Sequence, residues 1–209
     1  MEKRKDNTDF IVFSLKDYLD LFGETSFKKL ISDFSCPKDK DIVDFLNQKA
    51  VPLELGEYHS SKTYLVGFIN DERKFYLCGY FTLNNKPFII SDEVSKNKMK
   101  QLTEGKTNLK AISAVLIGQL SKNYTNGLNS VISGTDLLMK ALDTIKIVYK
   151  TIGVDLVYLE CKDVDYLRKF YENNGFDLYR DKDGKPIYTG KDSKLLCYIA
   201  KFKNLKLME

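Results

Sequence analysis

The residues best suited to chemistry lie at the starts and ends of two helix-forming segments in the second half of the chain. Ser133 and Gly134 follow a strand-like segment and open a long amphipathic helix. The first turn of a helix carries unpaired N–H groups and the positive end of the dipole, which favour phosphate. Gly134 would let a ligand approach the backbone closely. The same two residues also fit an ordinary N-cap and loop glycine, so both interpretations stay open.

A tyrosine near the end of the next helical segment is the second candidate. Tyr171 stands beside Phe170 on the apolar face of that segment. We therefore expect its ring at the rim of the core and its hydroxyl facing a cleft. A tyrosine in this position more often serves packing alone. Glu160 ends the preceding strand-like segment, and it is either a solvent-facing carboxylate or a base.

Length and composition favour one folded domain over residues 1–209, with a charged tail at residues 1–9. The chain has 43% hydrophobic and 12% aromatic residues, which is too apolar for a disordered chain. Its longest apolar run, residues 111–120, is far shorter than the roughly 20 residues that span a bilayer. No apolar stretch of the secretory kind follows the tail. We therefore expect a cytoplasmic protein that does not bind membranes.

The ionisable residues exclude some classes of site. The four cysteines form no CxxC pair, and the single histidine, His59, has no cysteine near it. We therefore expect no metal and no disulfide framework. The formal net charge of +4 comes from interspersed lysines and acids. Such a charge suits a nucleotide phosphate and an RNA equally well.

Apolar periodicity predicts an α/β arrangement around a mixed sheet. The predicted strands lie at residues 62–69, 75–83, 111–121, 154–159, 176–180 and 195–202. The predicted helices lie at residues 41–50, ended by Pro52, at residues 133–152, and at residues 164–171, capped by Asp163. Residues 10–34 read as a strand followed by irregular or short helical structure, and residues 91–108 as a loop with a helical turn.

Three strings in the second half carry a family resemblance. They are GTDLLMKAL at residues 134–142, LVYLEC at residues 156–161 and FYENNGF at residues 170–176. In this order and spacing they resemble the C-terminal half of a GNAT acetyltransferase. Residues 34–46 and GYFTL at residues 79–83 are similar to the front half of the toxin-like branch of that superfamily. The likeness covers residues 30–202.

The resemblance implies a fold and a set of roles. The fold would be a mostly antiparallel sheet, flanked by helices, in which two central strands splay apart. The strand matching residues 117–122 would pair through its backbone with the pantetheine arm of acetyl-CoA, and the loop at residues 129–134 would hold the pyrophosphate. Tyr171 would be the general acid that protonates the departing CoA thiolate. The implied cofactor-binding residues are Leu120, Ser121, Lys122, Asn129, Ile132, Ser133, Gly134, Thr135 and Tyr171.

The loop departs from the family pattern. That pattern reads Gln or Arg, two residues, Gly, one residue, then Gly or Ala. Here Asn129 and Ile132 replace the first two of these, and only Gly134 remains. A β-branched residue adopts positive φ poorly, so Ile132 predicts a different path for the loop. Asp136 adds a negative charge near the expected phosphate.

The predicted reaction is transfer of the acetyl group from acetyl-CoA to a primary amine by direct attack. Glu160 is the candidate base, N–H groups near Leu120 would polarise the carbonyl, and Tyr171 would donate to the sulfur. The acceptor would be a protein amine, an aminoacyl-tRNA or a small molecule, and lysines at positions 96, 98 and 100 would favour RNA. The alternative is a non-catalytic module that binds CoA or a partner. A homodimer is possible.

Overall fold

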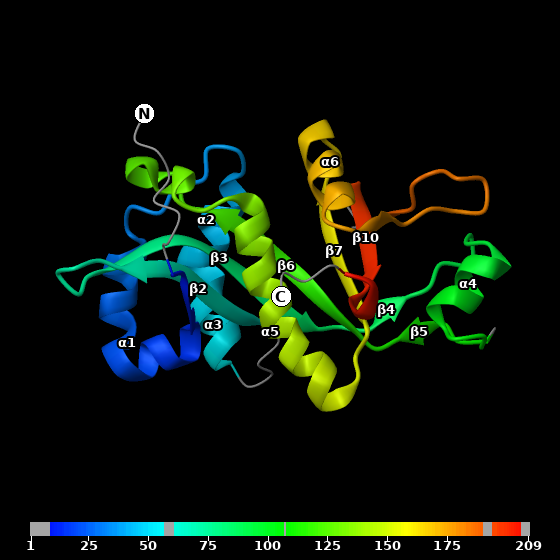
Figure 1. Ribbon diagram of the computed structural model, residues 1–209, viewed down its shortest axis with the longest axis horizontal. Helices are drawn as coiled ribbons and strands as arrows, with labels where there is room; N and C mark the ends of the chain where they lie inside the picture. The colour runs from blue at the N-terminus through cyan, green and yellow to red at the C-terminus, as the bar shows by residue number, and fades with distance from the viewer. Residues whose placement is uncertain (1–8, 57–60, 107, 190–193, 206–209) are drawn as a thin grey trace. The chain divides into compact units, whose positions relative to one another are not determined.

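The computed structural model describes residues 9–56, 61–106, 108–189 and 194–205 of the chain, and His59 lies outside them. Figure 1 shows the elements along the chain. In order, they are β1 (Ile11–Ser14), α1 (Leu15–Ile31), α2 (Lys40–Asp44), the π-helix η1 (Phe45–Lys49), α3 (Ala50–Leu55), β2 (Lys62–Ile69), β3 (Phe75–Asn85), β4 (Phe88–Ile89), α4 (Lys96–Leu102), β5 (Ala111–Ile112), β6 (Ala114–Lys122), the 3-10 helix η2 (Thr125–Ser130), α5 (Gly134–Ile152), β7 (Leu156–Lys162), α6 (Asp165–Asn173), β8 (Asp177–Leu178), β9 (Tyr188–Thr189), β10 (Leu195–Lys201) and the 3-10 helix η3 (Phe202–Asn204).

The main sheet has the strand order β1-β2-β3-β6-β7-β10-β8, with β9 also paired to β10. Strands β6 and β7 run parallel, whereas β1–β2, β2–β3, β7–β10 and β10–β8 are antiparallel. This confirms the predicted mixed, mostly antiparallel sheet flanked by helices. Contacts divide the chain into two compact units. The first comprises Met1–Asn84 and Gly118–Leu142, and the second comprises Asn85–Ile117 and Asp143–Glu209.

In the first unit, helices cover both faces of the antiparallel strands. On one face, α1, η1 and α3 pack against β2 and β3 through a core that includes Phe27, Leu46, Leu65 and Tyr80. The Tyr80 hydroxyl donates a hydrogen bond to the Ile42 carbonyl at 2.7 Å. The other face meets the start of α5. There, a Cβ added at Gly79 would lie 2.7 Å from the Ser121 carbonyl oxygen and 3.2 Å from the side chain of Leu137. This glycine permits close packing of β3, β6 and α5.

The first 56 residues differ most from the sequence prediction. Residues 15–31 form one long helix rather than the irregular or short helical structure predicted, and Gly23 produces a kink with φ 76° inside it. Pro52 does not end the next helical stretch, which runs on through η1 into α3 as far as Leu55. Pro52 lies in the first turn of α3, where proline is tolerated because its missing N–H has no partner there.

The second unit contains β7, β10, β8 and β9, with the first four residues of β6. One face of this sheet packs on a core that includes Phe88, Leu116, Tyr158 and Tyr179. The expected strand at residues 176–180 is shorter, because ladder pairing to β10 covers only β8. Asp163 is not the cap of α6. The N-cap is Val164, and the Asp163 carboxylate binds Arg168 at 2.6 Å and the Tyr188 hydroxyl at 3.1 Å.

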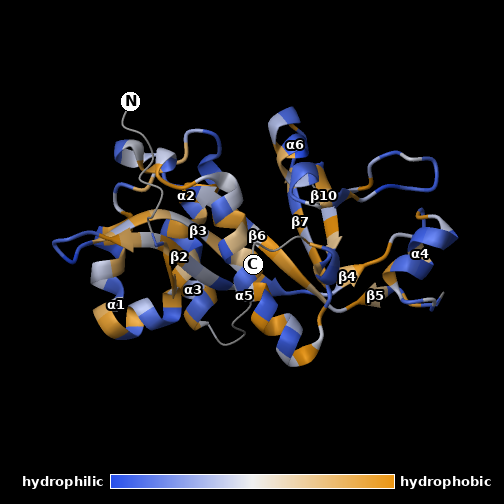
Figure 2. Cartoon of the chain, viewed as in Figure 1, coloured by the Kyte–Doolittle hydropathy of each residue, from blue (hydrophilic) through white to orange (hydrophobic). Residues whose placement is uncertain are grey.

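Helix α5 begins and ends where the sequence predicts. Its buried side chains are Leu137, Leu138, Ala141, Leu142 and Ile145. In Figure 2 its ribbon alternates between orange and blue, as expected for a helix with one apolar side. Ile152, the last residue of the helix, is 67% exposed. None of the helices within the described residues combines the length and hydropathy needed to cross a bilayer.

Candidate functional site

Strand β6 divides its hydrogen bonds between two neighbours. Its ladder with β7 joins residues 114–117 to residues 156–159, and no later described residue of β6 belongs to that ladder. The second half of β6 lies beside β3, where the Asn123 N–H donates to the Cys78 carbonyl at 2.7 Å. Because N–H directions alternate along a strand, the amides of Leu120 and Lys122 point away from β3.

Asn123, which sequence reasoning missed, holds the segment that follows β6. Its side-chain amide donates to the Leu77 carbonyl at 2.9 Å. Its side-chain oxygen accepts from the amides of Ser35 at 3.2 Å and Thr125 at 3.1 Å. The side chain is buried, so each bond replaces water that the groups have lost. No sequence signal marks this asparagine, because two of its three partners, Leu77 and Ser35, are far away in the chain.

A reciprocal pair of hydrogen bonds closes the start of α5. The Asp136 amide donates to Ser133 Oγ at 3.0 Å, and the Ser133 amide donates to the Asp136 carboxylate at 3.1 Å. This is a capping box with aspartate in place of glutamate. Two amides of the first turn, those of Gly134 and Thr135, have no hydrogen-bond partner among the described residues. They are the donors that an anion would meet.

Lys122 brings a positive charge to the same loop. Its ammonium donates to the Asn129 carbonyl at 2.7 Å. Burial, and then the nearby charge of Lys38, lower the pKa of Lys122, while Asp136 opposes the shift. A partly desolvated cation next to another cation is costly unless an anion balances it. Lys122, Asn129 and the start of α5 therefore lie close together.

The backbone of the loop before α5 does not place Ile132 in the positive-φ region. Positive φ occurs earlier, at Asn126 (51°) and Gly127 (76°), and Ile132 is not among the described residues with positive φ. The Ile132 side chain is 1% exposed, so it belongs to the core. Backbone contact is the only role left to it in ligand binding. Asp136 is engaged in the capping box, which takes up the Ser133 amide.

Tyr171 is buried in the second unit. It is 7% exposed, and its ring packs at 5.0 Å from Phe170 and 5.6 Å from Tyr198. Burial, followed by the influence of Cys161, Tyr166 and Tyr198, raises its pKa. None of the hydrogen bonds between described residues uses its hydroxyl. The phenol therefore keeps its proton across the physiological pH range and has a free donor.

Glu160 and Tyr171 lie on opposite faces of the β7–β10 ladder. Glu160 is opposite Cys197, which belongs to the core around Tyr158. Tyr171 instead contacts Tyr198, whose cross-strand partner is Leu159. Because adjacent residues of a strand face opposite ways, a proton cannot pass directly between the Glu160 carboxylate and the Tyr171 phenol. Each group would act from its own side of the sheet.

The predicted basic patch on α4 is partly neutralised. Lys98 forms an ion pair with Asp177 at 3.8 Å, and its side chain is 25% exposed. Lys96 and Lys100 are exposed on the same helix. Two lysines on a seven-residue helix are ordinary surface chemistry, so α4 gives little support to an RNA site.

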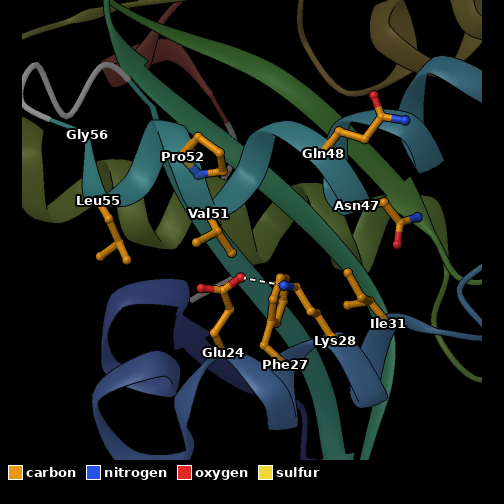
Figure 3. Close-up of a pocket in the computed structure, with 10 residues that line it drawn as sticks. All are labelled: Glu24, Phe27, Lys28, Ile31, Asn47, Gln48, Val51, Pro52, Leu55 and Gly56. Carbon is orange, nitrogen blue, oxygen red and sulfur yellow. Dashed lines mark ion pairs between the residues drawn. The ribbon is translucent and has the colours of Figure 1, made fainter.

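A hollow of about 520 Å³ lies elsewhere in the first unit, between α1 and the η1–α3 stretch (Figure 3). Phe27, Ile31 and Val51 contribute apolar surface to it, and Lys28 pairs with Glu24 at 2.7 Å beside them. None of the residues predicted from the sequence as catalytic or cofactor-binding lines it.

Comparison with known proteins places the fold. No family model matches the chain, and no curated protein matches its sequence. Solved structures do match. A tyrosine-to-phenylalanine mutant of the AtaT toxin superimposes with a TM-score of 0.63 at 16% identity, over 98% of this chain and 96% of that one. AtaTR bound with AcCoA gives 0.60 at 17% identity, over 93% and 94%. AtaT complexed with acetyl-methionyl-tRNAfMet gives 0.60 at 18% identity, over 93% and 96%. The chain therefore has the GNAT fold of these toxins.

Replacement of Asn123 by alanine tests whether this residue holds the loop. The variant loses three side-chain hydrogen bonds and leaves the Leu77 carbonyl without its donor. We expect the free energy of unfolding to fall by about 2–4 kcal/mol, measured by urea denaturation. Asn47→Ala is the control, because Asn47 bonds only to the Val43 carbonyl of its own helix (Figure 3). Equal losses in the two variants would contradict the assignment.

Proposed function

We propose that the chain is an acyl-CoA-dependent N-acetyltransferase that acts on the primary amine of an aminoacyl-tRNA. One observation carries the first part of the proposal. Strand β6 leaves the β7 ladder after Ile117, so the outward amides of Leu120 and Lys122 are available to an extended ligand. The similarity to AtaT in complex with acetyl-methionyl-tRNAfMet supports the second part. A protein amine or a small amine is the rival acceptor.

The residues of the first unit suit the nucleotide end of acetyl-CoA. The amides of Gly134 and Thr135 and the Lys122 ammonium supply donors and positive charge for a diphosphate. The Lys122 amide and the Leu120 carbonyl would pair with the pantetheine arm, and the Leu120 N–H would polarise the thioester carbonyl. The Ser121 amide points toward β3, so the backbone of Ser121 would not pair with the arm. Acetyl-CoA supplies the activated acetyl group. Asn129 and Ile132 would contact the cofactor through their backbones.

The residues of the second unit suit proton transfer. An amine is protonated in water, with a pKa of about 10 for a lysine and about 8 for an α-amino group, and must lose a proton before it attacks. Glu160 would accept that proton, directly or through a water. The amine nitrogen then bonds to the carbonyl carbon, its second proton passes to water, and the carbon–sulfur bond breaks. Tyr171 would donate its phenolic proton to the departing sulfur and later recover one from solvent.

A transfer assay tests the proposal. Purified protein is incubated with radiolabelled acetyl-CoA and a mixture of aminoacylated tRNAs, and label is measured in the RNA fraction before and after ester hydrolysis. We expect label that is released from the RNA as an N-acetyl amino acid. Uncharged tRNA is the control. No transfer to any charged tRNA, together with no effect of acetyl-CoA on the melting temperature, would favour the non-catalytic module.

Removal of the Tyr171 hydroxyl separates chemistry from binding. Tyr171→Phe keeps the ring contacts, so the protein should fold, while kcat should fall about 10²–10⁴-fold with little change in KM for acetyl-CoA. Tyr166→Phe is the matched control on the same helix, because Tyr166 is 51% exposed. Equal turnover of wild type and Tyr171→Phe would remove Tyr171 from the acid role.

The direction of the Tyr171 pKa shift gives a pH test of the same role. A general acid works in its protonated form, and a raised pKa keeps the phenol protonated to above about pH 10. Tyr171 should therefore cause no loss of kcat between pH 7 and pH 10. A high-pH limb below pH 9 that disappears in Tyr171→Phe would contradict the assignment.

Charge changes in the loop test the diphosphate site. Lys122→Met should raise the Kd for acetyl-CoA about tenfold, the loss expected for one charge-assisted hydrogen bond. Asp136→Asn should lower the Kd several-fold, because it removes a carboxylate near the diphosphate while its amide oxygen can still cap Ser133. Lys150→Met, at an exposed position in the last turn of α5, is the control. The measurement is isothermal titration, and an unchanged Kd in Lys122→Met would exclude Lys122 from the site.

A further inference from the structure

Two threonine side chains on β2 and β3 are buried, and the Thr63 hydroxyl is enclosed without a partner. Thr63 and Thr82 are directly opposite each other in the ladder and are 0% and 1% exposed. The Thr63 hydroxyl has no hydrogen bond, and none of the hydrogen bonds between described residues uses the Thr82 hydroxyl. A buried hydroxyl without a partner is destabilising, and valine would fit a strand at least as well. The unpaired Thr63 hydroxyl therefore indicates a role other than folding.

Further oxygen atoms lie next to this pair. Ser61 Oγ donates to Asn84 Oδ1 at 3.3 Å. A Cβ added at Gly118 would lie 2.9 Å from Thr82 Oγ1 and 3.0 Å from Asn84 Oδ1. The two oxygens therefore converge over the backbone of β6. Gly118 is exposed although it sits in an interior strand. The oxygens border a place where a ligand can reach the sheet.

A buried carboxylate that is paired with a lysine lies next to Thr63. Glu54 is 0% exposed, and its carboxylate accepts from Lys62 Nζ at 2.8 Å and from the Thr63 amide at 2.9 Å. Burial, and then the charge of Glu54, raise the pKa of Tyr64 on the same strand. A carboxylate and an amide oxygen repel anions and attract groups that donate hydrogen bonds.

We propose that Thr63, Thr82 and Asn84 form a subsite for the primary amine of the acceptor. This inference rests on the proposed function and deepens it by giving the amine a place in the first unit. The amine donates to the threonine hydroxyls and to Asn84 Oδ1, and Gly118 keeps the approach over β6 open. The three side chains position the acceptor and take no part in bond making.

Titration with a small amine tests the subsite without any acetyl transfer. The probe is methioninamide, and N-acetylmethioninamide is the same molecule without a basic amine. The full chain carries ¹³C-labelled threonine methyl groups, and both compounds are titrated at pH 7. We expect methioninamide to shift the methyl signals of Thr63 and Thr82, and N-acetylmethioninamide to leave them unchanged. Equal shifts from both compounds, or no shift from either, would overturn the proposal.

Valine substitutions separate binding from folding. Thr63→Val and Thr82→Val keep the side-chain shape, should not lower the melting temperature, and should raise the Kd for methioninamide about tenfold. Thr151→Val is the control, because its hydroxyl bonds only to the Ile147 carbonyl one turn earlier. Binding unchanged in both strand variants would overturn the proposal. Amine binding without any acetyl transfer would instead contradict the proposed function and leave the subsite in place.

Discussion

The candidate site depends on which neighbouring strand each part of β6 bonds to. A strand in a sheet interior normally bonds along both edges, but β6 stays in its ladder with β7 for four residue pairs only. Beyond Ile117 its described hydrogen bonds are on the β3 side, where Gly79 allows the backbones and α5 to approach closely. An edge with unpaired amides normally invites another strand. Here the same amides can serve an extended ligand that has carbonyl and amide groups of its own.

The chemistry divides between the two units in a way that suits acetyl transfer. The first unit offers main-chain donors and one partly desolvated cation, which under the proposed function would stabilise a phosphate. The second offers a phenol that burial keeps protonated and a carboxylate on the other face of its sheet. Under the proposed function, the groups that bind the cofactor and the groups that transfer protons are therefore supplied by different elements. Strand β6 and helix α5 are the two elements that contribute residues to both units.

Sequence periodicity predicted the elements whose partners are close in the chain. Helix α5, its serine cap and the β2–β3 hairpin follow from local patterns of apolar residues and turns. The kinked helix α1 was missed because a glycine inside it, Gly23, is a residue that often ends helices. Helix α3 was missed because Pro52 predicts the end of the preceding helix. The position of Tyr171 on the apolar face of its helix also followed from the local pattern of apolar residues. The contacts of Asn123 and of the Thr63–Thr82 pair could not be predicted. They depend on long-range pairing and strand register, which a single sequence does not specify.

Amide hydrogen exchange along β6 tests the central claim most directly. In the protein alone, the amide of Ile117 should exchange slowly, whereas those of Leu120 and Lys122 should exchange fast. Acetyl-CoA should then protect Leu120 and Lys122, and pantetheine alone should protect them less, because it lacks the diphosphate that the start of α5 would bind under the proposed function. Slow exchange at Leu120 and Lys122 without ligand, or no added protection with saturating acetyl-CoA, would contradict the account.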